Sequence, residues 1–380
     1  MMEAFTPLKR RYWEYLGRRK NARKKRAEWL SHAPEREAQA NAMRAAFPQP
    51  REVERLIIFL APGKDIVNGG IMSIVSLYEE TLRLKAIHGA ECLLCTLPSD
   101  DPPLLRYTKF QNDAHLFDFH DALNHFSRIR EILVHVPEYA IQSYVANLTP
   151  KEVRKLKKRR TCHNVLLQNI DMVHFEHYGS LRDLGKTTCT TAHRAYSGPD
   201  IAALARCPIQ LLSVFISPEK YRRVDYAEKR DILIVSPDHH PARESVLKRI
   251  HNELPELDVR VIQGMPYSEY KSLIAQAKWA LTFGEGLDGY FIETVFSGGV
   301  SFAAYNERFF TADFRDLETV FTSYEDFAEN LISTLRHLDN PLAYQTCQQE
   351  MFEICRSHYD HGRYVENLVA YYQSSFAVPI

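Results

Sequence analysis

The chain has 380 residues, of which 45% are hydrophobic and 25% are charged, and its formal net charge is zero. This composition indicates a globular protein of about two domains. Seven cysteines without framework spacing favour a reducing compartment. Because the sequence shows no standard secretion signal and no run of eighteen apolar residues, we expect a cytoplasmic protein that does not span a membrane.

Residues 1–50 form a basic segment. It carries twelve Lys and Arg against five Asp and Glu, and ten of the basic residues lie within positions 9–26. Apolar residues that share one helical face are Phe5, Leu8, Tyr12, Tyr15 and Leu16. A helix of this kind is suited to peripheral contact of residues 1–30 with the inner face of the membrane. The alternatives are a helix packed on the body and, less favoured, an arm that contacts nucleic acid, although no nucleic-acid pattern continues into the body.

From Arg55 the sequence alternates between strand-like and helix-like segments. Leu56–Leu60 predicts a buried strand, and a loop through Gly69-Gly70 leads into a helix over 71–87. Thr149 is the expected cap of an exposed basic helix. Further strands are predicted at 92–97, 131–136, 164–168 and 188–191. We assign residues 51–215 to an N-terminal acceptor domain.

A second alternating block begins at Asp231, after a polar stretch. Alternation of this kind predicts a parallel sheet covered by helices on both faces. We assign residues 228–350 to a C-terminal donor domain, and 351–380 to helices that return to brace the first domain. The expected fold class is α/β, with two doubly wound Rossmann-like domains facing each other across a cleft and a helical N-terminal extension. Strands are predicted at 231–235, 259–262, 279–283 and 300–304, and helices at 242–253, 267–277 and 290–298.

Two carboxylates stand out in the segment Phe283–Gly299. Glu285 lies in a glycine-punctuated loop, and Glu293 lies in the helix that follows, with seven residues between them. Free N–H groups at such a helix start suit an anion such as a nucleotide diphosphate. The carboxylates are better suited to hydroxyl groups, and a nucleotide sugar supplies both kinds of group.

This block resembles the donor domain of retaining GT-B glycosyltransferases, glycosyltransferase family four in particular. The resemblance runs over about seventy residues: a strand and glycine turn at Val261–Gly264, a helix containing Glu269-Tyr-Lys-Ser-Leu, and then the Glu285/Glu293 pair in the family's E-x7-E arrangement. Gly69-Gly70 matches the family's diglycine loop less specifically. The sequence departs from the family at Pro237, near an expected arginine, and at Asp288, which replaces a frequent glycine.

The resemblance implies roles for most of the candidate site residues. Glu293 would accept hydrogen bonds from the ribose, Glu285 would lie beside the donor sugar, and the main chain at Met265 would contact the base. The groups expected at the diphosphate are the backbone N–H groups of Gly69, Gly70 and Gly286 and the side chain of Arg243.

Three further residues are candidates from their positions alone. His135 ends a predicted strand, where we expect it to face the cleft and to bind the sugar or serve the acceptor; a core histidine is nearly as well supported. Glu138 and His193 are weaker candidates.

No metal or cofactor is expected. The chain contains no D-x-D pair for a metal-bound diphosphate, and the C-x-x-C of Cys92 and Cys95 lies in an apolar strand without a second pair.

The predicted function is transfer of a sugar from a nucleotide-sugar donor to a hydroxyl acceptor, lipid-linked or saccharide, in surface polysaccharide or glycolipid synthesis. The reaction is expected to be retaining and metal-independent. The alternatives are another enzyme of the same fold, such as a nucleotide-sugar epimerase or a sugar-phosphate synthase, and a non-catalytic sugar- or lipid-binding partner.

Overall fold

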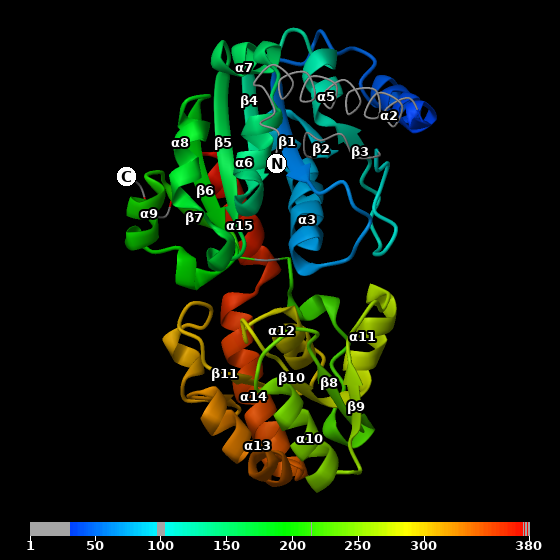
Figure 1. The fold of residues 1–380 in the computed structure, drawn as a ribbon, viewed down its shortest axis with the longest axis vertical. Coiled ribbons are helices and arrows are strands. Elements are labelled where there is room, and N and C mark those ends of the chain that lie inside the picture. Colours follow the sequence, from blue (N-terminus) through cyan, green and yellow to red (C-terminus); the bar gives the residue numbers. More distant parts are fainter. Residues whose placement is uncertain (1–30, 97–102, 214, 375, 377, 379–380) are drawn as a thin grey trace, which may run out of the picture.

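The first domain is built on a seven-stranded parallel sheet. In the computed structural model, which describes residues 31–96, 103–213, 215–374, 376 and 378, the strand order is β3-β2-β1-β4-β5-β6-β7. The central strands are buried because helices cover both faces of the sheet (Figure 1). The strands are β1 (Arg55–Ala61), β2 (Glu91–Thr96), β3 (Leu116–Asp118), β4 (Glu131–Pro137), β5 (Arg160–Leu167), β6 (Lys186–Thr191) and β7 (Ile209–Leu211).

The helices of the first domain connect these strands. The predicted strands correspond to β1, β2, β4, β5 and β6, whereas the three-residue strands β3 and β7 were not predicted from the sequence. The predicted helix over 71–87 is divided into α3 and α4 at Leu84. The helices are α2 (Ala33–Ala46), α3 (Gly69–Arg83), α4 (Lys85–His88), α5 (Phe119–His125), α6 (Ile141–Asn147), α7 (Pro150–Lys157), α8 (Tyr178–Arg182) and α9 (Pro199–Ala205).

The second domain has a five-stranded parallel sheet of order β12-β11-β10-β8-β9. All strands predicted here are present, and only the two-residue β12 was missed. The strands are β8 (Arg230–Val235), β9 (Asp258–Val261), β10 (Ala277–Leu281), β11 (Val300–Ala304) and β12 (Val320–Phe321). The helices are α10 (Arg243–Glu253), α11 (Tyr267–Gln276), α12 (Gly289–Phe296), α13 (Tyr324–Leu338), α14 (Pro341–His358) and α15 (His361–Tyr372).

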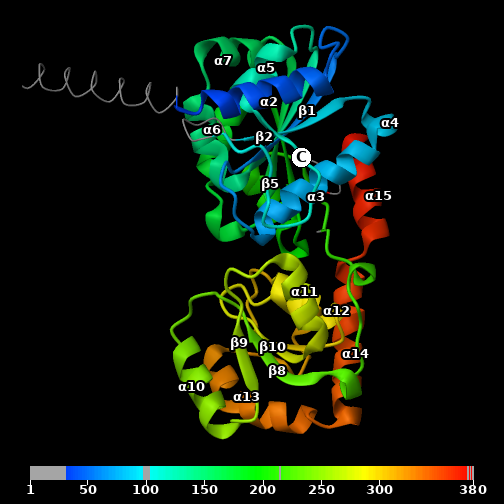
Figure 2. The same ribbon diagram turned by 90° about the vertical axis from the view of Figure 1, so that its right-hand side faces the viewer.

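The last helix crosses back to the first domain. Helix α14 packs in the second domain, whereas α15 lies against the first (Figure 2). The Tyr372 hydroxyl lies 2.8 Å from Oγ1 of Thr81 on α3, and the Tyr371 hydroxyl lies 3.2 Å from Oγ1 of Thr188 on β6. The chain therefore passes between the domains twice, and the domain boundaries inferred from the sequence stay predictions.

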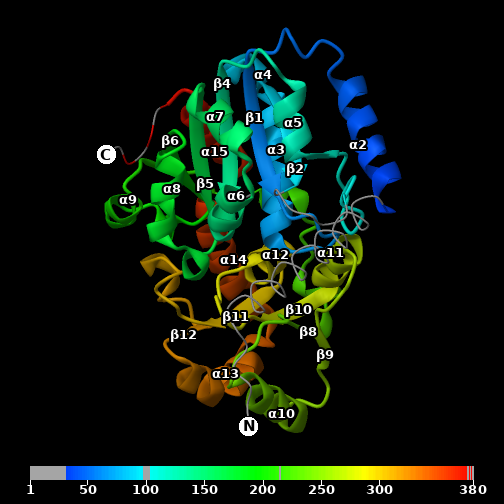
Figure 3. The same ribbon diagram turned by 45° about the horizontal axis from the view of Figure 1, so that its top comes forward.

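Helix α2 is the described part of the basic N-terminal segment. It lies along the first domain beside α5 (Figure 3), and Gln39 donates from Nε2 to the carbonyl of Leu116 on β3 at 3.1 Å. The basic stretch proposed for membrane contact lies in residues 1–30, outside the described residues. None of the described helices combines the length and apolar character needed to cross a lipid bilayer.

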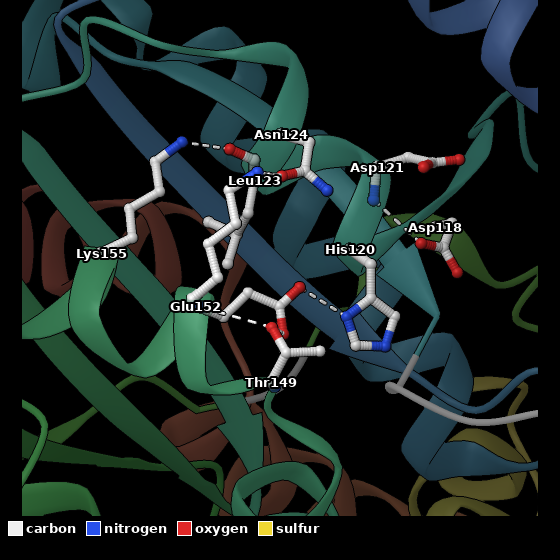
Figure 4. A network of polar contacts seen from close by, with 9 residues as sticks. Asp118, His120, Asp121, Leu123, Asn124, Thr149, Glu152 and Lys155 are labelled. Carbon is white, nitrogen blue, oxygen red and sulfur yellow. Dashed lines mark hydrogen bonds and ion pairs between the residues drawn. The ribbon is translucent and has the colours of Figure 1, made fainter.

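A polar network fixes the start of α7, as predicted from Thr149. The Thr149 hydroxyl accepts the N–H of Glu152 at 3.3 Å, and the Glu152 carboxylate accepts the N–H of Thr149 at 2.7 Å (Figure 4). The other Glu152 oxygen lies 2.6 Å from Nδ1 of His120 on α5. This hydrogen bond raises the pKa of His120. Lys155 donates to the carbonyls of Leu123 and Phe126 at the end of α5, so this basic residue of α7 joins the two helices.

Candidate active site

A cavity of about 780 Å³ lies between the two domains. The carboxyl ends of both parallel sheets face each other across it (Figure 1), which is where open α/β sheets bind ligands. Loops after β1, β4, β5 and β6 form one wall, and loops after β8, β9 and β10 form the other. Several of the residues that line this cavity were singled out from the sequence as site candidates, among them Gly69, Gly70, Glu138, Met265, Glu285 and Glu293.

Glu285 lies at the contact between the domains. It follows β10, and its Oε1 accepts a hydrogen bond from Nδ2 of Asn169, which follows β5 of the first domain. Burial, together with the nearby carboxylates of Asp238 and Asp171, raises the pKa of Glu285 to about 7. The position of Glu285 is therefore held by a partner from the opposite wall.

Glu293 is 5% exposed on the first turns of α12. The Tyr267 hydroxyl donates to its Oε1 at 3.3 Å, whereas Oε2 is buried and accepts no hydrogen bond. Burial raises the pKa of Glu293 to about 8, although the nearby hydroxyl groups of Tyr221 and Tyr267 partly offset this effect. A carboxyl group with this pKa is mostly protonated at neutral pH, so it can both donate to and accept from ligand hydroxyls.

Gly286, in the loop before α12, does not present its N–H group to the cavity as expected. Gly286 has a φ of +80°, and its N–H donates to the carbonyl of Phe283 at 3.4 Å. A Cβ at Gly286 would lie 2.7 Å from the Phe310 ring. The prediction that Gly286 contacts the diphosphate is therefore wrong, because this glycine turns the chain against the core.

The start of α12 is occupied by a carboxylate of the chain itself. Asp288 caps the helix by accepting the N–H of Phe291 at 3.0 Å. Burial and the neighbouring carboxylate of Asp238 raise the pKa of Asp288. A phosphate at this helix end would compete with Asp288, so α12 is a poor anion site.

The start of α3 is the better anion site. Asn68 caps this helix by accepting the N–H of Ile71 at 2.8 Å. Both Gly69 and Gly70 line the cavity, and a Cβ at Gly69 would have no neighbour within 4 Å. Gln168 donates to the Gly70 carbonyl at 3.0 Å. The backbone of this turn is therefore open to a ligand at the positive end of a 15-residue helix.

His135 does not face the cleft. Its side chain is fully buried within the first domain, where its ring stacks on Phe59 at a centroid distance of 4.2 Å. Its Nδ1 lies 2.9 Å from Nδ2 of Asn164, and burial lowers its pKa to about 3. The prediction that His135 contacts the sugar or the acceptor is therefore wrong, because the strand turns this side chain into the core. Glu138, three residues later, reaches the cavity instead.

Arg243 is the third predicted site residue that does not line the cavity. It begins α10, and it is not among the lining residues. Met265 lines the wall that follows β9, as expected. None of the described lining residues is a lysine or arginine, so no described cationic side chain in the wall replaces Arg243. Among the described residues, no group of three His, Cys, Asp or Glu side chains is placed to hold a metal ion.

Several lining residues were not identified from the sequence. Asn169 and Gln168 follow β5, Asp238 follows β8, and Tyr267 begins α11. These residues share a position that the sequence could have revealed, because each lies just beyond the carboxyl end of a predicted strand or at the start of the helix that follows. Polar residues there were available in the sequence, but which of them point inward depends on tertiary packing.

Comparison with solved structures identifies the fold. No protein-family model matches the sequence, and curated protein sequences contain no match. The structure of HepE from Anabaena in complex with UDP-glucose aligns with a TM-score of 0.56 at 9% identity, covering 84% of this chain and 99% of that one. The chain has a GT-B fold.

Two synthases show the same similarity. An alpha,alpha-trehalose-phosphate synthase (UDP-forming) from Burkholderia vietnamiensis aligns with a TM-score of 0.52 at 11% identity, covering 86% of this chain and 98% of that chain. A sucrose-phosphate synthase from Thermosynechococcus elongatus aligns at 0.50 with 9% identity, over 84% of this chain and 99% of its own. At this level of identity the similarity concerns the fold alone.

Proposed function

We propose that this protein is a glycosyltransferase that moves a sugar from a nucleotide-sugar donor to a hydroxyl group of an acceptor. The observation that carries the proposal is the presence of Glu285 and Glu293 in one cavity between the two domains. One known structure of this fold is the complex of HepE with UDP-glucose. The retaining outcome and the role of each glutamate rest on the E-x7-E resemblance.

We propose that the donor nucleotide binds against Glu293 and Met265. The unpaired Oε2 of Glu293 is a buried acceptor without a donor, and a ribose hydroxyl would supply one. Met265 lines the same wall after β9, where its main chain can contact the base. The donor sugar would then extend toward Glu285, which orients its hydroxyl groups and stabilises positive charge developing at the anomeric carbon.

We propose that the leaving diphosphate binds at the start of α3. Departure of the nucleoside diphosphate adds negative charge to the phosphate oxygens, which free N–H groups at a helix N-terminus stabilise. Gly69 and Gly70 provide such groups in the wall of the first domain. Because this site comes from the opposite domain to Glu293, the donor would bridge both walls of the cavity.

The acceptor and the pathway are further parts of the proposal. We favour a lipid-linked or saccharide acceptor in surface polysaccharide or glycolipid synthesis, since the basic residues 9–26 suit an anionic membrane surface. The reaction is proposed to need no divalent metal, because the sequence lacks a D-x-D pair.

One observation favours a non-catalytic sugar-binding role. The described lining residues include no lysine or arginine that would neutralise the diphosphate as it leaves. A protein that binds a sugar without cleaving its donor does not need such a group. Release of the nucleoside diphosphate from a nucleotide sugar distinguishes catalysis from this binding role.

We expect the purified full-length chain to release a nucleoside diphosphate from at least one nucleotide sugar in a panel, and to do so equally with 10-fold chelator excess over enzyme. Release is measured by a coupled nucleotide assay, with boiled protein as the control. Binding of a nucleotide sugar without release, in the presence of a broad acceptor mixture, would favour the sugar-binding role. Turnover that stops on chelation and returns with a divalent metal would contradict the metal-independent mechanism.

A further inference from the structure

The cavity wall is rich in carboxyl groups. Its lining carboxylates are Glu138, Asp238, Glu285, Asp288 and Glu293, and no described lining residue is a lysine or arginine. His193 is the lining imidazole, and burial lowers its pKa to about 4, so it is neutral at pH 7. Burial raises the pKa of Glu138 and of Glu285 to about 7, so a cationic group placed beside these carboxyls favours their ionised forms, whereas an anionic group disfavours them.

Glu138 supplies an unused hydrogen-bond acceptor in this wall. The residue is 2% exposed and follows β4 of the first domain. Its Oε1 accepts the backbone N–H of Asn169 at 3.0 Å, whereas Oε2 is buried and accepts no hydrogen bond. A buried carboxylate oxygen without a donor destabilises the protein unless a ligand supplies one.

Asn169 connects Glu138 to Glu285. Its backbone N–H is bonded to Glu138, and its side-chain amide is bonded to Glu285 across the domain contact. The two carboxylates repel each other, since Glu285 contributes to the raised pKa of Glu138 after burial. A neutral hydroxyl would satisfy Oε2 of Glu138 but would leave this repulsion in place. An ammonium group would satisfy the oxygen and offset both charges.

We propose that the wall formed by Glu138, Asn169 and Glu285 is a subsite for a protonated amino group of a sugar substrate. This inference rests on the proposed glycosyltransferase function and names its substrate class. The amino group belongs either to the transferred sugar, which lies by Glu285, or to the acceptor, which approaches from the domain of Glu138. A phosphorylated acceptor is disfavoured at the same position, because its charge has the sign of the wall.

The test compares ligands that differ only in the amino group. To test whether the amino group belongs to the donor, calorimetric titrations of the full chain use UDP-glucosamine, UDP-N-acetylglucosamine and UDP-glucose. To test whether it belongs to the acceptor, the titrations use glucosamine, N-acetylglucosamine and glucose, each with and without saturating UDP. We expect the free amine to bind roughly tenfold more tightly than both neutral ligands in one of the two series.

Glu138→Gln keeps the size of the side chain and an oxygen that can accept the Asn169 N–H, but it removes the charge and replaces the unpaired oxygen by an NH2 donor. We expect the amine preference to fall to about twofold or less in this variant, while Glu54→Gln, at an exposed site before β1, keeps it. Thermal unfolding shows whether each variant is folded.

Two outcomes would overturn the inference. One is equal or weaker binding of the amine in both series, even where the neutral donors bind and are turned over. The other is an amine preference that survives in Glu138→Gln. If no nucleotide binds at all, the proposed function fails, and the sugar series without UDP still decides whether the subsite prefers an amine.

Discussion

Replacing Glu285 by alanine is expected to lower kcat for glycosyl transfer by about two to three orders of magnitude, which is the loss typical when a charge-stabilising group is removed from a transition state. Glu285 lines the cavity and is held from the opposite wall by Asn169. Its carboxylate would face the anomeric carbon, where positive charge develops as the diphosphate leaves. Because this charge is largest in the transition state, the donor KM should change much less than kcat. Steady-state kinetics with the preferred donor measure both constants.

Glu256→Ala is the matched control for Glu285→Ala. Glu256 is an exposed glutamate in the same domain, between α10 and β9, so its loss removes the same charge from the surface. This control should keep wild-type kcat. Glu285→Ala with kcat within about twofold of wild type would show that Glu285 has no part in the chemistry.

Replacing Glu293 by alanine is expected to weaken nucleoside diphosphate binding by roughly ten- to a hundredfold, which corresponds to the loss of about two hydrogen bonds to the ribose hydroxyls. In the free protein Glu293 is 5% exposed, and its Oε2 accepts no hydrogen bond. The ribose hydroxyls would provide the missing partners. Calorimetric titration of the nucleotide into both proteins measures the change.

The melting temperature of Glu293→Ala distinguishes a ligand-binding role of Glu293 from a structural role. A buried carboxyl with an unsatisfied oxygen stabilises the empty protein little, so Glu293→Ala should melt at or above the wild-type temperature. The lost hydrogen bond from Tyr267 is long, at 3.3 Å. A Tm that falls by several degrees while nucleotide affinity stays the same would show that Glu293 serves the fold and not the ligand.

The regular elements of both domains were largely predictable from the sequence. Long apolar strands such as β1 and β4 are largely buried on both faces and have a clear signal. The strands that were missed are the short edge strands β3, β7 and β12. Two or three residues carry too little periodicity, and pairing with a neighbouring strand decides whether they are extended.

The site was only partly predictable. Glu285 and Glu293 reach the cavity together with Gly69, Gly70 and Met265, because each belongs to a loop or helix start beyond a strand. The order of strands, loops and helices along the chain is enough to predict such positions.

The predictions for three residues, His135, Gly286 and Arg243, are wrong because tertiary packing decides where these residues lie. His135 is the fifth residue of β4, and the pleat of the sheet turns its ring onto Phe59. Gly286 bonds to its own loop. Arg243 begins α10 outside the cavity wall. Which face of a strand is enclosed, and which loop N–H groups are already used, are properties of the folded chain.

The most direct test of this account is hydrogen–deuterium exchange of the full-length chain with and without a saturating nucleoside diphosphate, beginning with UDP. We predict slower exchange in two segments: the first turn of α3, at residues 69–72, and the first turns of α12, at residues 289–293, on opposite walls of the cavity. Unchanged exchange in both segments at saturation, with protection confined to other parts of the chain, would contradict the placement of the donor between the two domains.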